Sequence, residues 1–315
     1  LMISGFIKGH PRREVCYRAD NIYGPYEKKV ILETEFAGFG GVGQGTIVDA
    51  PDGKWYGFIF QDRGGVGRVP TLEPCTWQDG WPILGDEKGN VPLKMSKPVL
   101  GYNDKTIVHS DDFAKGKLDL QWQWNHNPVD EAWSLTERKG YLRLKTSRIA
   151  QNLFMAPNTL TTRMEGPTCE AVVKMDVSQM KNGDVAGFAA FQGDAALLSV
   201  AREGKKWFVL GSKDNSVLSD EQKKVTDVKH EEVYRQALKS KTIYLKISCD
   251  FRDHKDLATL SYSLDGKNWT EAIRDFRMNF DYRRLFMGTR FAIYNYAAKN
   301  AGGYVDIDCF GYSKK

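Results

Sequence analysis

A chain of 315 residues is long enough for two domains of ordinary size, each with its own buried core. Its 45 basic and 40 acidic residues give a formal net charge of +5, and both signs are mixed along the chain. We therefore expect no nucleic-acid partner, because such proteins gather their basic residues in a patch. We also expect no contact with a membrane, since no apolar stretch approaches the roughly 18 residues that a spanning helix needs.

The cysteine pattern and the start of the chain narrow the protein class further. The absence of a short Cys-x-x-Cys spacing argues against a structural zinc site and a thioredoxin-type motif, and predicts buried free thiols at Cys16, Cys75, Cys169, Cys249 and Cys309. The chain opens on Leu1, without an initiator methionine and without the basic and apolar regions of a signal peptide. We expect that an upstream part of the protein precedes it.

Nearly every segment has the composition of a short β-strand, bounded by Gly, Pro, Asn or Asp. The predicted strands lie at residues 14–19, 45–50, 54–60, 141–146, 169–177, 185–191, 206–211, 243–251, 258–264 and 302–310. The best helical candidate is the charged segment 220–238, which also fits a loop. We predict an all-β protein. The polar segment from residue 85 to 106 marks the boundary between two domains. We divide the chain into a first region, 1–95, a linker, 96–107, and a sandwich-like domain, 108–315.

The last predicted strand carries two carboxylates. Simple alternation places Val305, Ile307 and Cys309 on one face, and Asp306 and Asp308 on the other with Tyr304 and Phe310. One interpretation is a solvated edge strand. The other is a structural Ca²⁺ site in which Asp111 or Asp112, near the start of the domain, joins Asp306 and Asp308, because hard cations prefer oxygen ligands.

Four segments of the second region resemble the concanavalin-like β-sandwich at the C-terminus of many family 43 glycoside hydrolases. They read DLQWQWNHNPVDEAWSLTERKGYLRLKT, NTLTTRMEGP, GDVAGFAAFQ and NYAAKNAGGYVDIDCFGY. In the first region, YRADNIYGPYEKKVIL and the segment from GVGQGTIVDAPDG to DGWPILG resemble the end of that family's five-bladed β-propeller. The resemblance implies the final part of a five-bladed propeller followed by a concanavalin A-like, jelly-roll sandwich.

The resemblance also implies a function. Members of the family cut β-xylosidic or α-L-arabinofuranosidic bonds in xylan-type polysaccharides, so we expect a polysaccharide or oligosaccharide partner. They invert the anomeric centre with an aspartate base, a glutamate acid and a second aspartate that tunes the acid. By the family's order these carboxylates lie upstream of Leu1, which leaves no catalytic residue in this chain and makes it inactive alone. We expect no required cofactor, and a periplasmic or secreted location.

Glu165, Gly166 and Pro167 spell the motif of the family's catalytic acid. They follow NTLTTR, however, which matches the sandwich and not the propeller. We therefore expect Glu165 to have no catalytic role.

Three residues of the first region match the family's substrate pocket. By resemblance, Arg68 in GVGRVP bonds the sugar next to the cut, and its planar fork suits paired hydroxyls. The alternative is a rim arginine paired with Asp62 or Asp79. Gln44 stands where many members carry a histidine that contacts a central metal ion or water, and Arg63 occupies a variable position.

In the sandwich, Trp124 and His126 belong to a tryptophan-rich loop that, by resemblance, faces the propeller and contacts substrate. This leaves an alternative function: a non-catalytic module that binds carbohydrate or stabilises the propeller. Because only about one and a half blades are present, we also expect self-association through the open propeller face.

Overall fold

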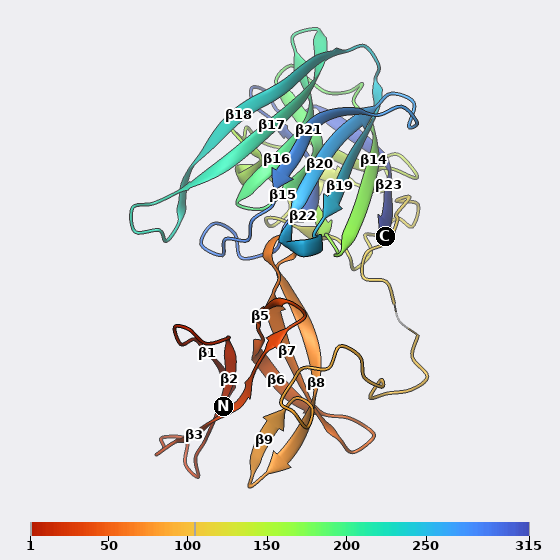
Figure 1. Cartoon of the computed structure of the whole chain (residues 1–315). Helices are drawn as coiled ribbons and strands as arrows, with labels where there is room; N and C mark the ends of the chain where they lie inside the picture. The colour runs from red at the N-terminus through yellow and green to blue at the C-terminus, as the bar shows by residue number, and fades with distance from the viewer. Residues whose placement is uncertain (1, 104, 315) are drawn as a thin grey trace. The chain divides into compact units, whose positions relative to one another are not determined.

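The computed structural model describes residues 2–103 and 105–314, and the chain forms two compact units (Figure 1). The first comprises Leu1–Arg63 and Gly67–Lys105, and the second comprises Gly64–Val66 and Thr106–Lys315. The predicted segments 1–95, 96–107 and 108–315 include Leu1, Asp104 and Lys315, which lie outside the described residues.

The first unit consists of three small antiparallel sheets, ordered β1-β2-β3, β4-β5 and β6-β7-β8-β9. In the last sheet each strand pairs with its neighbour along the chain, as in a propeller blade. The strands are β1 (Met2–Gly5), β2 (Arg13–Arg18), β3 (Glu27–Glu33), β4 (Glu35–Phe36), β5 (Phe39–Gly41), β6 (Gly43–Asp49), β7 (Trp55–Asp62), β8 (Arg68–Gln78) and β9 (Trp81–Leu84).

A small core holds this unit together, and two carboxyl groups lie inside it. Its buried apolar side chains come from β2, β3, β7, β8 and β9, with Val42 and Val91 from outside the strands: Cys16, Ile31, Leu32, Val42, Ile59, Cys75, Trp81, Leu84 and Val91. Glu14 and Glu73 are both fully buried. The Glu14 carboxylate accepts the backbone N–H of Gln44 at 2.5 Å. Burial raises the pKa of Glu73 to about 7, so the neutral acid is the form that the core favours.

The second unit is a sandwich of two seven-stranded antiparallel sheets. One sheet has the order β10-β13-β22-β15-β16-β17-β18, and the other β11-β12-β23-β14-β19-β20-β21. The strands are β10 (Gln123–Trp124), β11 (Trp133–Ser134), β12 (Leu142–Lys145), β13 (Leu160–Arg163), β14 (Thr168–Asp176), β15 (Asp184–Phe191), β16 (Asp194–Glu203), β17 (Lys206–Leu218), β18 (Val225–Leu238), β19 (Thr242–Asp250), β20 (Leu257–Ser263), β21 (Thr270–Arg277), β22 (Arg290–Ala297) and β23 (Tyr304–Lys314).

Helical structure is limited to four single 3₁₀ turns in the described residues, which confirms the all-β prediction: η1 (Gly64–Val66), η2 (Asp130–Ala132), η3 (Leu153–Met155) and η4 (Arg252–His254). Across residues 2–103 and 105–314, no helix has the length and apolar character needed to cross a membrane.

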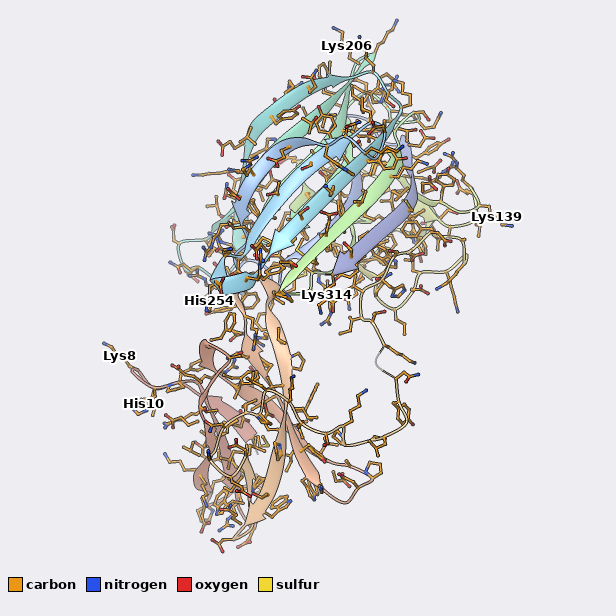
Figure 2. All side chains as sticks on the ribbon, turned by 45° about the vertical axis from the view of Figure 1, so that its right-hand side comes forward. Lys8, His10, Lys139, Lys206, His254 and Lys314 are labelled. Carbon is orange, nitrogen blue, oxygen red and sulfur yellow. The ribbon has the colours of Figure 1, made fainter. Side chains whose placement is uncertain are left out.

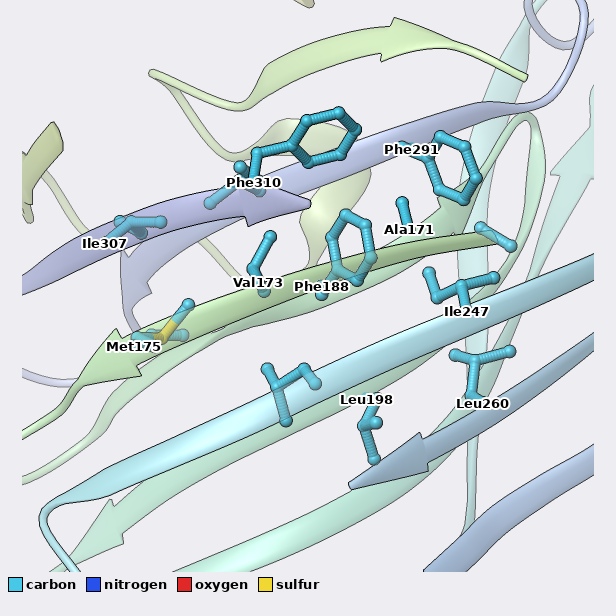
Figure 3. Packing of buried hydrophobic residues seen from close by; sticks show 14 of the residues in the cluster. Ala171, Val173, Met175, Phe188, Leu198, Ile247, Leu260, Phe291, Ile307 and Phe310 are labelled. Carbon is cyan, nitrogen blue, oxygen red and sulfur yellow. The ribbon is translucent and has the colours of Figure 1, made fainter. Parts of the chain in front are cut away.

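The main core lies between the two sheets (Figure 3). Strict alternation along β14 buries Val173 and Met175 on one side and leaves their neighbours half-buried. Phe188, on β15 of the opposite sheet, stacks on Phe291 with ring centroids 5.6 Å apart. The burial of such rings contributes about 2 kcal/mol each.

The β15 sheet is also covered on its other face. There Leu153 of η3 packs with Phe191 and Tyr294 in a second buried cluster. A strand buried on both faces has no reason to alternate, which explains the continuous apolar run VAGFAAF at residues 185–191.

The alternation predicted for β23 is wrong beyond Ile307. The register with β14 shifts between Lys174 and Met175, which pair with Cys309 and Ile307, so that Asp308 is an extra, unpaired residue. Such a bulge reverses the facing of the residues that follow it. Phe310 therefore lies in the core with Val305 and Ile307, while Cys309 is only partly buried.

The charged segment 220–238 is neither a helix nor a simple loop. Its residues from Val225 form β18, a long edge strand paired to β17 alone. Most of its side chains are exposed, and only Tyr234 and Leu238 pack with the main core. A strand that is solvated over most of both faces shows no alternation in its sequence.

Three residues from the middle of the first unit's sequence belong to the second unit. The carbonyl of Gly65 accepts the backbone N–H of Thr289 at 2.9 Å, and Val66 packs against the main core. A Cβ on Gly64 would collide with the Asp256 carboxylate, and φ of Gly64 is +52°. The glycines of RGGVGRVP thus allow close approach to the sandwich.

We expect the stability of the first unit to depend on pH through Glu73. The pKa of Glu73 is about 7 in the folded protein, against an ordinary value of 4.5. At a pH between these two values, the folded state therefore holds a proton that the unfolded state has lost. The free energy of unfolding should fall by about 3 kcal/mol as the pH rises through this window. Glu73→Gln should remove that fall, and urea unfolding of both proteins at a series of pH values measures it.

Glu87→Gln, at an exposed position of the same unit, is the matched control and should leave the pH dependence unchanged. The same loss of stability with pH in Glu73→Gln as in the parent would contradict the assignment.

Candidate functional site

A depression of about 440 Å³ opens in the first unit, and its walls carry charged side chains. The loop between β1 and β2, where Figure 2 labels Lys8 and His10, forms one wall. The polar residues of the lining include His10, Arg12, Glu35 and Asp62. Arg12 and Asp62 connect this depression to the residues predicted from the sequence.

Asp62 is shared by two arginines. Arg12 donates from Nη1 to one of its oxygens at 2.9 Å, and Arg68 donates from Nε to the other at 3.3 Å. Arg12 also donates from Nη2 to the Gln44 side-chain oxygen at 3.0 Å. Arg68 and Asp62 are directly opposite each other in the β7–β8 pairing, so the hairpin register sets their contact. We call Arg12, Gln44, Asp62 and Arg68 the arginine cluster.

Burial and the neighbouring charges both affect the pKa of Arg12. Arg12 is only 8% exposed, and burial lowers its pKa, with Arg68 adding to the effect and Asp62 opposing it. Both guanidinium groups also lie near the Phe60 ring, at 4.5 Å for Arg12 and 4.3 Å for Arg68 from the centroid. The carboxylate and the ring hold two cations close together, and of the two only Arg12 lines the depression.

The cluster contains one residue that the sequence did not predict. Arg12 follows Pro11 and precedes Arg13 just before β2, and the sequence does not indicate which arginine points inward. The predicted rim contact of Arg68 with Asp62 is formed. The backbone oxygen of Asp79, the other predicted partner, accepts from Arg18. A pocket role for Arg68 stays a prediction, as does a substrate role for Gln44.

Arg63 lies in a different environment. Its guanidinium lies 4.5 Å from the centroid of Phe39 and 5.5 Å from that of Phe36, and burial lowers its pKa. This packing supports the chain where it leaves β7, and the structure does not bring Arg63 into the arginine cluster.

The two sandwich candidates have partners within the second unit. Trp124 is half-buried, packs against the main core and lies 5.2 Å from Trp133 between ring centroids. The Nε2 atom of His126 lies 2.9 Å from the Phe154 carbonyl oxygen. Substrate contact by either residue stays a prediction.

The aspartates predicted to bind Ca²⁺ do not converge. Asp306 is 3% exposed and accepts from Arg143 at 2.7 and 2.9 Å and from Arg138 at 3.0 Å. Asp308 pairs with Lys174, and Asp112 accepts the backbone N–H of Ala114. Among the residues that the structure describes, no group of three or more His, Cys, Asp or Glu side chains is arranged to hold a metal ion. Arginine and lysine side chains, and not a metal ion, neutralise Asp306 and Asp308.

Glu165 lies in the second unit, as its sequence context predicts. It accepts a hydrogen bond from the Tyr312 hydroxyl at 2.7 Å and lies 3.6 Å from the Lys314 ammonium. Both contacts tie the segment before β14 to the last strand.

We expect Asp306→Asn to destabilise the second unit by about 3 kcal/mol, because it removes the buried carboxylate that Arg138 and Arg143 share and leaves them only the more exposed Asp176 and Glu137. Asp308→Asn is the matched control: its pair with Lys174 is about one-third exposed on each side and should cost under about 1 kcal/mol. Urea unfolding of the three proteins measures both effects. If Ca²⁺ raised the Tm and Asp306→Asn abolished that rise, the result would instead support the predicted metal site.

The second unit matches a known family model. Residues 110–313 match the β-xylosidase C-terminal concanavalin A-like domain. The whole chain also resembles solved structures. It matches a bifunctional GH43-CE protein of Bacteroides eggerthii with 40% identity and a TM-score of 0.86, over 100% of this chain and 39% of that one. A GH43 glycoside hydrolase engineered to display both endo-xylanase and exo-arabinofuranosidase activity matches with 28% identity and a TM-score of 0.85, over 100% of this chain and 64% of that one.

A curated β-xylosidase of Formosa agariphila is 33% identical over 96% of this chain and 53% of its own length. The chain matches two curated relatives over most of its own length, and it spans only about half of theirs. These matches cover both units, and the one to the family model covers more than half of the chain. The chain belongs to glycoside hydrolase family 43, and its second unit is the C-terminal concanavalin A-like domain of the β-xylosidase type.

Proposed function

We propose that this chain takes part in the hydrolysis of β-xylosidic or α-L-arabinofuranosidic bonds, and that the catalytic carboxylates lie outside residues 1–315. The names of the relatives support the substrate class, since they include β-xylosidases and an α-L-arabinofuranosidase. The proposed reaction is an inverting hydrolysis, which needs two carboxyl groups roughly 6.5–9.5 Å apart on either side of the sugar.

The arginine cluster is the observation that carries this proposal. It fixes Arg68 by a hydrogen bond to Asp62, which Arg12 holds in turn from a nearly buried position. A guanidinium held in this way loses little conformational entropy when it donates to a sugar hydroxyl. We assign Arg68 to sugar binding, and Arg12 and Asp62 to its positioning.

Two acidic residues that could be mistaken for catalytic ones fit a supporting role better. Asp62 is shared by two arginines, and Glu165 is bound by Tyr312 and Lys314 in the other unit. Trp124 packs against Trp133 and the main core, so we do not extend the proposal to carbohydrate binding by the sandwich.

Hydrolysis of p-nitrophenyl β-D-xyloside and α-L-arabinofuranoside tests the proposal. We expect no turnover by the 315-residue chain and clear turnover by a protein extended upstream in the same gene, because the extension supplies the acid and the base. Activity of the short chain that Glu165→Gln abolishes would refute the proposal. Inactivity of the extended protein on both substrates would refute the substrate class.

In the extended protein, Arg68→Ala should lower kcat/KM by about 10- to 100-fold, the effect of losing a hydrogen bond from a charged donor. Arg68→Lys should recover little of the loss, since an ammonium lacks the planar fork. Arg277→Ala removes an exposed arginine elsewhere and should leave kcat/KM unchanged. An unchanged kcat/KM in Arg68→Ala would show that Arg68 is a rim arginine that does not bind the sugar.

A further inference from the structure

Two of the five cysteines lie opposite each other on neighbouring strands. Cys169 of β14 is the direct register partner of Cys249 of β19. Both side chains belong to the main core, so both point to the same face of the sheet, and they are only 3% and 4% exposed.

The geometry of antiparallel strands brings such a pair within disulfide range. Directly opposite residues have Cα atoms about 4.5 or 5.5 Å apart, depending on the type of pair. Disulfides span Cα separations of about 4.4–6.8 Å. The Cys249 thiol also lies 3.6 Å from the Met164 sulfur, and a hydrogen bond to Cys249 lowers the pKa of Cys169, while burial raises the pKa of Cys249.

The pair lies near the end of its sheet. Cys169 is the second residue of β14, and Cys249 is the last but one of β19. On its other side Cys169 pairs with Lys314, which Figure 2 labels at the same end of the second unit as His254. Local opening of strand ends requires far less free energy than global unfolding, so a small oxidant can reach these thiols from this end.

The other cysteines lack such a partner. Cys16 pairs with Met2 and Lys29, Cys75 with Trp55 and Leu84, and Cys309 with Lys174. Within the part of the chain that the structure describes, Cys169 and Cys249 are the one cysteine pair in direct register.

We propose that Cys169 and Cys249 are a redox-sensitive pair that forms a cross-strand disulfide. The oxidant is a low-molecular-weight disulfide, such as glutathione disulfide. The Cys169 thiolate attacks one sulfur of the oxidant and releases the first glutathione thiolate, which takes up the proton that Cys169 lost. The Cys249 thiolate then attacks the Cys169 sulfur of this mixed disulfide and releases the second glutathione thiolate, which takes up the proton from Cys249. Two thiols are oxidised, and one disulfide is reduced to two thiols.

Alkylation of the unfolded chain by iodoacetamide tests the proposal by mass. The chain is first incubated with glutathione disulfide, both in its native state and during refolding, and is then denatured without reductant. We expect the reduced protein to take up five alkyl groups and the oxidised protein three, with one cross-linked peptide that contains Cys169 and Cys249. Uptake of five groups after both treatments, a glutathione adduct without a cross-link, or a cross-link at other cysteines would overturn the proposal.

Thermal unfolding gives an independent readout. Closure of a loop of about 80 residues should raise the Tm of the second unit by several degrees in the oxidised protein. Cys169→Ala and Cys249→Ala should both lose this redox-dependent shift, whereas the matched control Cys16→Ala should keep it. A shift of the same size in Cys169→Ala would show that the stabilisation comes from elsewhere.

Discussion

The burial of one face of each seven-stranded sheet against the other is the constraint on which the second unit depends. Both sheets contribute apolar side chains to one continuous core, and aromatic rings such as Phe188, Phe291 and Phe310 pack within it. A polar group near this core must be paired, because an unpaired buried charge is far less stable than a solvated one. Asp306 meets that condition with two arginines, which is why a carboxylate can lie on a central strand.

In the first unit, the register of one hairpin has a comparable importance. Asp62 ends β7 and Arg68 begins β8, and the pairing of these two residues determines where the arginine cluster forms. A slip of one residue would move one of the two side chains to the other face of the sheet and separate them. The candidate site therefore depends on strand pairing that is local in sequence, while Arg12, which completes the cluster, comes from the loop between β1 and β2, far from this hairpin in sequence.

The sequence predicted the fold class because most strands bury one face and alternate accordingly, as β14 and β19 do. Where a strand departs from that condition, prediction failed for a physical reason. The solvated edge strand β18 carries no apolar period, and the bulge at Asp308 reverses the facing of Cys309 and Phe310. Neither feature leaves a local signal that distinguishes it from a helix, a loop or a regular strand.

The candidate site was predicted in part. Arg68 was predicted from the family resemblance, and its contact with Asp62 was one of the two rim pairings considered as the alternative, whereas Arg12 is distant in sequence and carries no motif. The predicted metal ligands failed because side-chain type alone does not show whether a carboxylate faces a metal or an arginine. Asp306 and Arg143 come together through the pairing of β12 and β23, and Arg138 reaches the same carboxylate from the turn between β11 and β12.

The second unit is discontinuous in sequence, since it includes Gly64–Val66 from within the first. A gene segment that begins at residue 106 would encode all fourteen strands of the sandwich but not the tripeptide that accepts the Thr289 N–H and packs Val66 on the core. A protein that starts at residue 106 would therefore leave the Thr289 N–H without this acceptor and would lack the apolar cover that Val66 gives the core.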